Sequence, residues 1–139
     1  MVLETIMTGE ILLLGRILFA GMLTAMALPH FVKLDFYEQY ASTNDVPMPK
    51  IAVLTSGGIL LVGSLMILTG FATAVGSILL LIFFAGVTPQ IHDFWNEEDD
   101  QQKQQEMFHF QKNIVMTGAV LVILAMSVES WPYSLETLL

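Results

Sequence analysis

The sequence predicts an all-α protein: a four-helix transmembrane bundle, up-and-down, with both termini on the same side of the membrane. Two observations predict this class. Residues 51–91 are forty-one residues without a charged side chain, and a hydrocarbon core about 30 Å thick needs ~20 apolar residues per helical crossing. The chain is also 55% hydrophobic and only 13% charged, which leaves more apolar surface than a soluble protein of this size can hide.

The uncharged run supplies the two central helices, which we expect at about 51–69 and 72–91. A very short reversal at residues 69–73 joins them into an antiparallel hairpin. A soluble core helix would carry polar residues along one face at a spacing of about 3.6, and this run shows no such face. The hairpin is therefore expected to lie within the membrane.

The two outer helices are expected at about 10–29 and 112–130, so that 1–139 forms a single membrane domain. Residues 1–9 are expected to form an interfacial turn before the first helix. The polar stretch through Gln105 lacks apolar periodicity and therefore predicts a solvated loop. Belt aromatics after residue 130 indicate the far interface.

Composition excludes several classes of function. The chain has no cysteine, which excludes disulfides, thiolate metal sites and thiol redox chemistry. Thirteen acidic residues against five basic ones give a net charge of −8, which argues against a nucleic-acid partner. The expected surroundings are the lipid bilayer of the cell membrane, with the chain crossing it several times.

Lysine placement predicts the orientation. Lys33, Lys50, Lys103 and Lys112 fall on the side of the two long connections, whereas the terminal side has only Arg16. Because cytoplasmic segments are enriched in lysine and arginine, the two connections are expected in the cytoplasm and both termini outside.

Three histidines form the candidate functional face. His30 ends the first expected helix, His92 ends the third and His109 precedes the fourth, so an up-and-down bundle brings all three to one side of the membrane. The set of candidate ligand-binding residues at this level is His30, His92, Asp93, Trp95, His109, Lys112 and Asn113.

Two interpretations of this face stay open. The histidines can be half-solvated interfacial residues that pair with carboxylates, or they can bind a quinone or other headgroup and handle its protons. His92 and Asp93 are the favoured pair, with Trp95 placed to stack on a ring. No metal site is expected, because no HxxxH or HxxE spacing is present.

Arg16 is an intramembrane charge with two possible roles. It lies inside the first expected helix, where it can form an ion pair with Glu10 or Glu129 or extend its head to the interface. Alternatively, it is a buried cation that binds an anionic ligand.

Several segments in order along the chain resemble the DoxX family of small four-helix membrane proteins. They are GRILFAG (15–21), HFVKLDFYEQYA (30–41), VPMPK (46–50), SGGILLVGSLMILTG (56–70), TPQIHDFW (88–95) and MFHFQKN (107–113). The resemblance extends from Gly15 to about Ala125, and the HDFW and HFQKN segments look archaeal.

The resemblance implies the fold and the membrane location. The family takes its name from a subunit associated with thiosulfate:quinone oxidoreductase, which implies an accessory subunit of quinone-linked redox metabolism beside an oxidoreductase partner, with quinone as a possible cofactor. It leaves open whether the chain is itself an enzyme. The alternative is a non-catalytic assembly or structural protein, including a homo-oligomer, which pairs through the small residues Gly57, Gly58 and Gly63.

Overall fold

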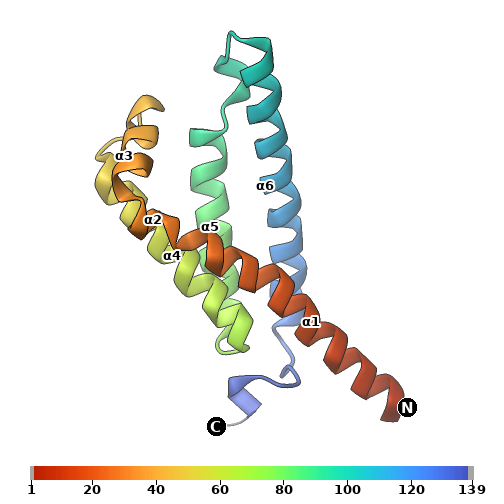
Figure 1. Ribbon diagram of the computed structural model, residues 1–139. Helices are drawn as coiled ribbons and strands as arrows, with labels where there is room; N and C mark the ends of the chain where they lie inside the picture. Colours follow the sequence, from red (N-terminus) through yellow and green to blue (C-terminus); the bar gives the residue numbers. More distant parts are fainter. Residues whose placement is uncertain (1, 138–139) are drawn as a thin grey trace.

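The structure is all-helical, as the sequence predicts. Figure 1 shows the computed structural model, which describes residues 2–137. Every regular element in this range is a helix. The elements are α1 (Val2–Ala27), α2 (Pro29–Val32), α3 (Leu34–Thr43), α4 (Pro49–Thr69), α5 (Thr73–Ile91), η1 (Phe94–Asn96), α6 (Asp100–Met126) and η2 (Leu135–Thr137).

Four helices are long and apolar enough to cross a membrane, which confirms the predicted number of spans. The candidate spans are Met7–Val32, Pro49–Thr69, Thr73–Asn96 and Asp100–Met126. The beginning of α1 and the short helix η2 lie toward the same end of the molecule (Figure 1). The protein is therefore a multi-pass membrane protein.

The spans pack in chain order. α1 and α3 pack on α4, α4 packs on α5, and α5 packs on α6. In Figure 1, α1 runs obliquely across α5 and α6. The α4–α5 hairpin is central, because α1 and α3 pack on α4 and α6 packs on α5. Leu60, Ile67 and Leu80 of the hairpin are fully or almost fully buried, whereas outer residues such as Ile17 and Val115 are exposed. Such an apolar exterior is suited to contact with lipid.

The reversal between α4 and α5 depends on two residues with positive φ. Gly70, at +72°, ends α4, and Ala72, at +47°, precedes α5. A side chain on Gly70 would also collide with Ser134, whose Cβ would lie 2.5 Å from the added Cβ. Glycine therefore meets both demands at this position, backbone conformation and close approach.

The hairpin helices approach most closely at Gly63 and Gly76. A Cβ on Gly63 would lie 3.0 Å from the carbonyl oxygen of Gly76, and a Cβ on Gly76 would lie 2.9 Å from that of Gly63. Small residues permit such backbone contact in lipid, where van der Waals packing drives helix association. Gly63 and Gly76 thus serve the interface between α4 and α5.

The outer helices differ from their expected bounds. The interfacial turn predicted for residues 1–9 is wrong, because α1 already begins at Val2 and ends at Ala27. Pro29 does not close this helix; it occupies the first turn of α2, where a missing N–H costs nothing.

The fourth span begins at Asp100, so the solvated loop predicted through Gln105 is wrong. The Asp99 carboxylate accepts a hydrogen bond of 2.8 Å from the backbone N–H of Gln102 and caps the helix. Glutamine, lysine and glutamate are good helix formers without any apolar periodicity. The helix ends at Met126, four residues before its expected end.

We expect Gly76→Ala to lower the melting temperature of the purified protein in detergent. Its Cβ would lie 2.8 Å from the Cβ of Met66, so α4 and α5 must separate at a cost of about 1–3 kcal/mol. Gly118→Ala is the matched control, because nothing lies within 4 Å of its added Cβ, and its melting temperature should be unchanged or higher. An equal fall in both variants would contradict the packing argument.

Candidate functional site

A large apolar cavity lies between the N-terminal helices and the α5–α6 pair. Its volume is about 720 Å³. α1, α2 and α3 contribute Met22, Met26, His30, Tyr37 and Tyr40, α4 contributes Val53, Ser56 and Leu60, and α5 and α6 contribute Phe83, Val87, His92, Lys112 and Asn113. The cavity exists because α1 packs on α4 while α6 packs on α5, so that these two outer helices stay apart along part of their length.

A second cavity, of about 560 Å³, adjoins the first and is polar. Its lining comes mainly from the first turns of α6, including Asp99, Gln102, Gln105, Glu106 and His109. Tyr40, His92 and Lys112 line both cavities. These three residues therefore mark the boundary between an apolar and a polar compartment.

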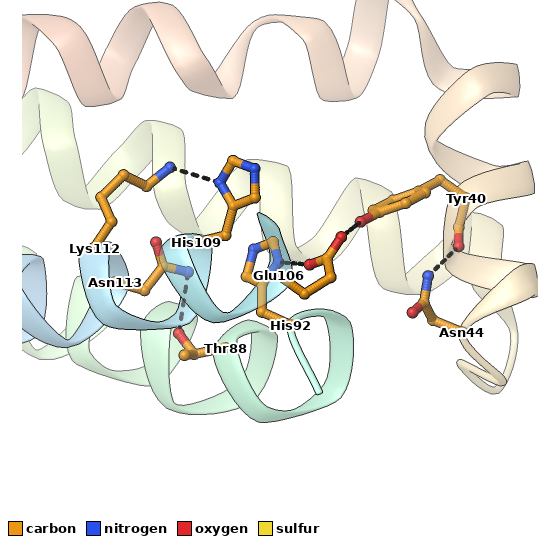
Figure 2. Close-up of polar contacts among 8 residues, drawn as sticks. All are labelled: Tyr40, Asn44, Thr88, His92, Glu106, His109, Lys112 and Asn113. Atoms are coloured by element: carbon orange, nitrogen blue, oxygen red, sulfur yellow. Dashed lines mark hydrogen bonds and ion pairs between the residues drawn. The ribbon is translucent and has the colours of Figure 1, made fainter. Parts of the chain in front are cut away.

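His92 and Glu106 form the central contact of this boundary. His92 Nδ1 lies 2.7 Å from Glu106 Oε2, and the two side chains are only 16% and 13% exposed. The other carboxylate oxygen, Oε1, accepts a hydrogen bond of 3.4 Å from the hydroxyl of Tyr40. Figure 2 shows the three side chains in one row, with Glu106 between the other two. They come from α3, the end of α5 and α6, and so depend on the tertiary fold.

Further residues of α6 extend this polar row. The rings of His92 and His109 stack with their centroids 5.2 Å apart, and Lys112 Nζ lies 3.5 Å from His109 Nδ1 (Figure 2). Asn113 is buried and donates a hydrogen bond of 3.2 Å to the hydroxyl of Thr88 on α5. Four of the predicted site residues, His92, His109, Lys112 and Asn113, are thus brought together.

The surroundings of Tyr40 at this boundary shift the pKa of its hydroxyl strongly. Burial, which is the largest cause, together with the negative charge of Glu106 and the hydrogen bond to it, raises the pKa of Tyr40 to about 12. These causes disfavour the phenolate. Tyr40 therefore stays a hydrogen-bond donor throughout the physiological pH range.

His30 lies in the apolar cavity, apart from the Glu106 contact. Its ring stacks on Tyr37, with centroids 4.8 Å apart. Its Nδ1 is buried, and among the described residues it makes no hydrogen bond of good geometry. Gly57 gives it space, because a Cβ there would lie 2.5 Å from the Cβ of His30.

Asp93 and Trp95 are not brought into the row. Asp93 accepts a hydrogen bond of 2.7 Å from Asn96, and Trp95 contacts the rings of Phe94 and Phe110 and is half exposed. The expectation that Trp95 can stack on the ring of a ligand stays a prediction. The chain leaves α5 at Ile91 and turns into η1, so successive side chains point in different directions.

Glu106 is the partner that the sequence interpretation did not select. It lies three residues before His109, with Lys112 three residues later, and residues at this spacing share one face of a helix. Recognising that α6 begins before Glu106 would have revealed this face.

Arg16 has a structural role that differs from the expected ion pair. Its guanidinium donates to the carbonyls of Ile67 (3.2 Å) and Leu68 (2.8 Å) at the end of α4 and to those of Pro132 (3.0 Å) and Tyr133 (3.3 Å). Neither Glu10 nor Glu129, both among the described residues, forms an ion pair with it. Arg16 is only 4% exposed, and the last carbonyls of a helix are favourable partners for a buried cation.

No group of three histidine, aspartate or glutamate side chains among the described residues is arranged to hold a metal ion. The polar row instead combines proton donors and acceptors at the mouth of an apolar cavity. Such an arrangement suits a ligand with a polar head and an apolar body.

Comparison with protein-family models decides the family. The DoxX model matches residues 11–93, which is more than half of the chain. The chain belongs to the DoxX family. The match gives no support to an archaeal origin, and neither the curated proteins nor the solved structures include a match to the chain.

Only part of the candidate site of this DoxX protein lies within the residues that the family model matches. Tyr40 and His92 lie within the matched residues, whereas Glu106, His109 and Lys112 lie on α6 beyond them. The boundary between the two cavities is therefore built jointly by the matched region and by α6.

We expect the Tyr40 phenol to titrate near pH 12. The wild-type absorbance at 295 nm minus that of Tyr40→Phe, read after a rapid pH jump, should rise at about that pH. Since the folded-state pKa lies above the ordinary value of about 10, the stability that the neutral phenol contributes is complete below pH ~10 and is lost as the pH rises toward 12. A midpoint close to 10 would contradict the burial argument.

Proposed function

We propose that this DoxX protein is a membrane subunit of quinone-linked redox metabolism that holds a quinone headgroup where its two cavities meet. The observation that carries the proposal is the shared lining of the apolar and polar cavities by Tyr40, His92 and Lys112. A quinone has a polar ring and an apolar tail, so one end of the ligand matches each compartment.

The size and lining of the apolar cavity support this ligand class. Small-molecule sites typically enclose ~300–1,000 Å³ and combine apolar walls with a few convergent polar groups, and the volume here is about 720 Å³. Phe83 and the stacked pair of His30 and Tyr37 offer ring surfaces. His92 and Lys112 offer polar atoms for the ring oxygens.

In this proposal the redox chemistry is shared with an oxidoreductase partner. The chain has no cysteine and thus no thiolate to hold a redox centre of its own. Its part is to bind and orient the headgroup and to provide acid–base groups, while the partner supplies or receives electrons. We place the protein in the cell membrane, and the positions of Lys33, Lys50, Lys103 and Lys112 favour an orientation with the polar cavity toward the cytoplasm.

We expect the wild-type protein, purified in mild detergent and extracted with organic solvent, to carry quinone close to one per chain. His92→Ala removes a polar group from the cavity boundary and should lower the amount severalfold without loss of helicity. Gln111→Ala is the control, because Gln111 is exposed on α6 and lines neither cavity. Absence of quinone from the wild type, or equal retention by His92→Ala, would reject the proposal.

Substitutions at two neighbouring glycines, Gly57 and Gly58, can distinguish this function from the alternative assembly role. Gly57 is covered by His30 and Gly63 by Gly76, whereas nothing lies within 4 Å of a Cβ on Gly58. Of the proposed pairing face, Gly58 is thus the glycine still open to another protein.

We therefore expect Gly57→Ala to displace His30 and to reduce quinone retention, while Gly58→Ala leaves retention unchanged. Extraction and quantification of quinone from both variants checks this. The assembly role predicts a different result: Gly58→Ala would weaken cross-linking to a partner in native membranes, and Gly57→Ala would not affect retention.

A further inference from the structure

The contact between His92 and Glu106 fixes the position of the proton on the imidazole. A carboxylate only accepts hydrogen bonds, and its oxygen lies 2.7 Å from His92 Nδ1. Nδ1 must therefore carry a hydrogen. In the neutral ring the other nitrogen, Nε2, then has a free lone pair and is a hydrogen-bond acceptor.

This acceptor is available to a ligand. In the described part of the chain, the hydrogen bond to Glu106 is the only one that the His92 ring makes. His92 lines both cavities, and its ring faces that of His109. Glu106 lines the polar cavity but not the apolar one. It therefore acts on a ligand in the apolar cavity only through His92.

The other two groups beside His92, His109 and Lys112, each carry a hydrogen-bond donor. Lys112 Nζ carries hydrogens and no lone pair, so in its 3.5 Å contact with His109 Nδ1 the histidine nitrogen accepts. His109 then carries its hydrogen on Nε2. The stacked rings therefore offer a ligand one acceptor, on His92, and one donor, on His109, beside the ammonium of Lys112.

We infer that this site, resting on the proposed quinone function, prefers the hydroxyl-bearing reduced form, the quinol, over the quinone. A quinol hydroxyl donates to His92 Nε2, whereas both quinone oxygens only accept and leave that lone pair unmatched. Lys112 and His109 serve an oxygen of either form, so they do not discriminate. Glu106 is a positioning residue, because it sets which nitrogen of His92 accepts.

Loss of one hydrogen bond in a largely buried site corresponds to about a tenfold change in affinity. We therefore expect a short-chain quinol to bind the purified full-length protein about tenfold more tightly than the matching quinone. Anaerobic titration calorimetry in detergent, with a chemical reductant holding the quinol, measures both dissociation constants.

Glu106→Gln tests the role of Glu106 with little change of shape. Because the Tyr40 hydroxyl donates to Oε1, the glutamine oxygen takes that position and its amide nitrogen faces His92 Nδ1. The amide then donates to Nδ1, which moves the ring hydrogen to Nε2 and removes the acceptor. The ratio of the two affinities should then fall close to one, while binding itself persists. Glu98→Gln, at an exposed acid outside both cavities, should keep the wild-type ratio.

Nitrogen-15 NMR of the wild-type imidazoles measures directly which nitrogen of His92 carries the hydrogen. This measurement does not depend on whether a Glu106 variant folds. The His92 signals, assigned by their absence in His92→Ala, should show hydrogen on Nδ1 and none on Nε2 in the neutral ring. Hydrogen on Nε2 would overturn the inference.

The outcomes distinguish this inference from the function on which it rests. Equal affinities in the wild type overturn the preference for quinol and leave the quinone function intact. A wild-type preference that Glu106→Gln leaves unchanged overturns the role of Glu106 as the positioning residue. Failure of both ligands to bind, or binding that His92→Ala does not weaken, overturns the proposed function and the inference together.

Discussion

The backbone contact between α4 and α5 at Gly63 and Gly76 is the constraint on which the rest of the structure depends. It makes the hairpin a narrow central unit, with α1 on one helix and α6 on the other. Because the hairpin separates these two outer helices, a cavity of about 720 Å³ remains between them. The cavity is thus a consequence of close packing elsewhere.

Polar groups are enclosed and paired at one end of the molecule, whereas at the other end they line cavities. At the terminal end, Arg16 is enclosed and bound to four carbonyl oxygens of α4 and the C-terminal segment, which pairs groups that lipid would leave unsatisfied. At the other end, His92, Glu106 and Lys112 keep access to two cavities. The first arrangement stabilises the fold, and the second leaves hydrogen-bonding capacity for a ligand.

The proposed site combines residues with different tasks. The apolar walls exclude water from a ligand's body, Tyr40 and His92 border both compartments, and Glu106 orients the imidazole. Burial keeps Tyr40 protonated, with a pKa of about 12, so that it remains a donor to Glu106. The carboxylate therefore has defined partners on both oxygens, and the ring of His92 has a defined proton position.

The sequence by itself determined the four spans, the place of the hairpin turn and the side on which the histidines lie, because a charge-free run of forty-one residues has few stable arrangements in lipid. It did not give the start of α6, where an aspartate cap and helix-forming polar residues replace apolar periodicity. Only the tertiary structure decided that His92 pairs with Glu106, fourteen positions away, and not with the adjacent Asp93. The physical reason is that neighbours in a turn point apart, whereas helix packing brings distant side chains within hydrogen-bonding distance.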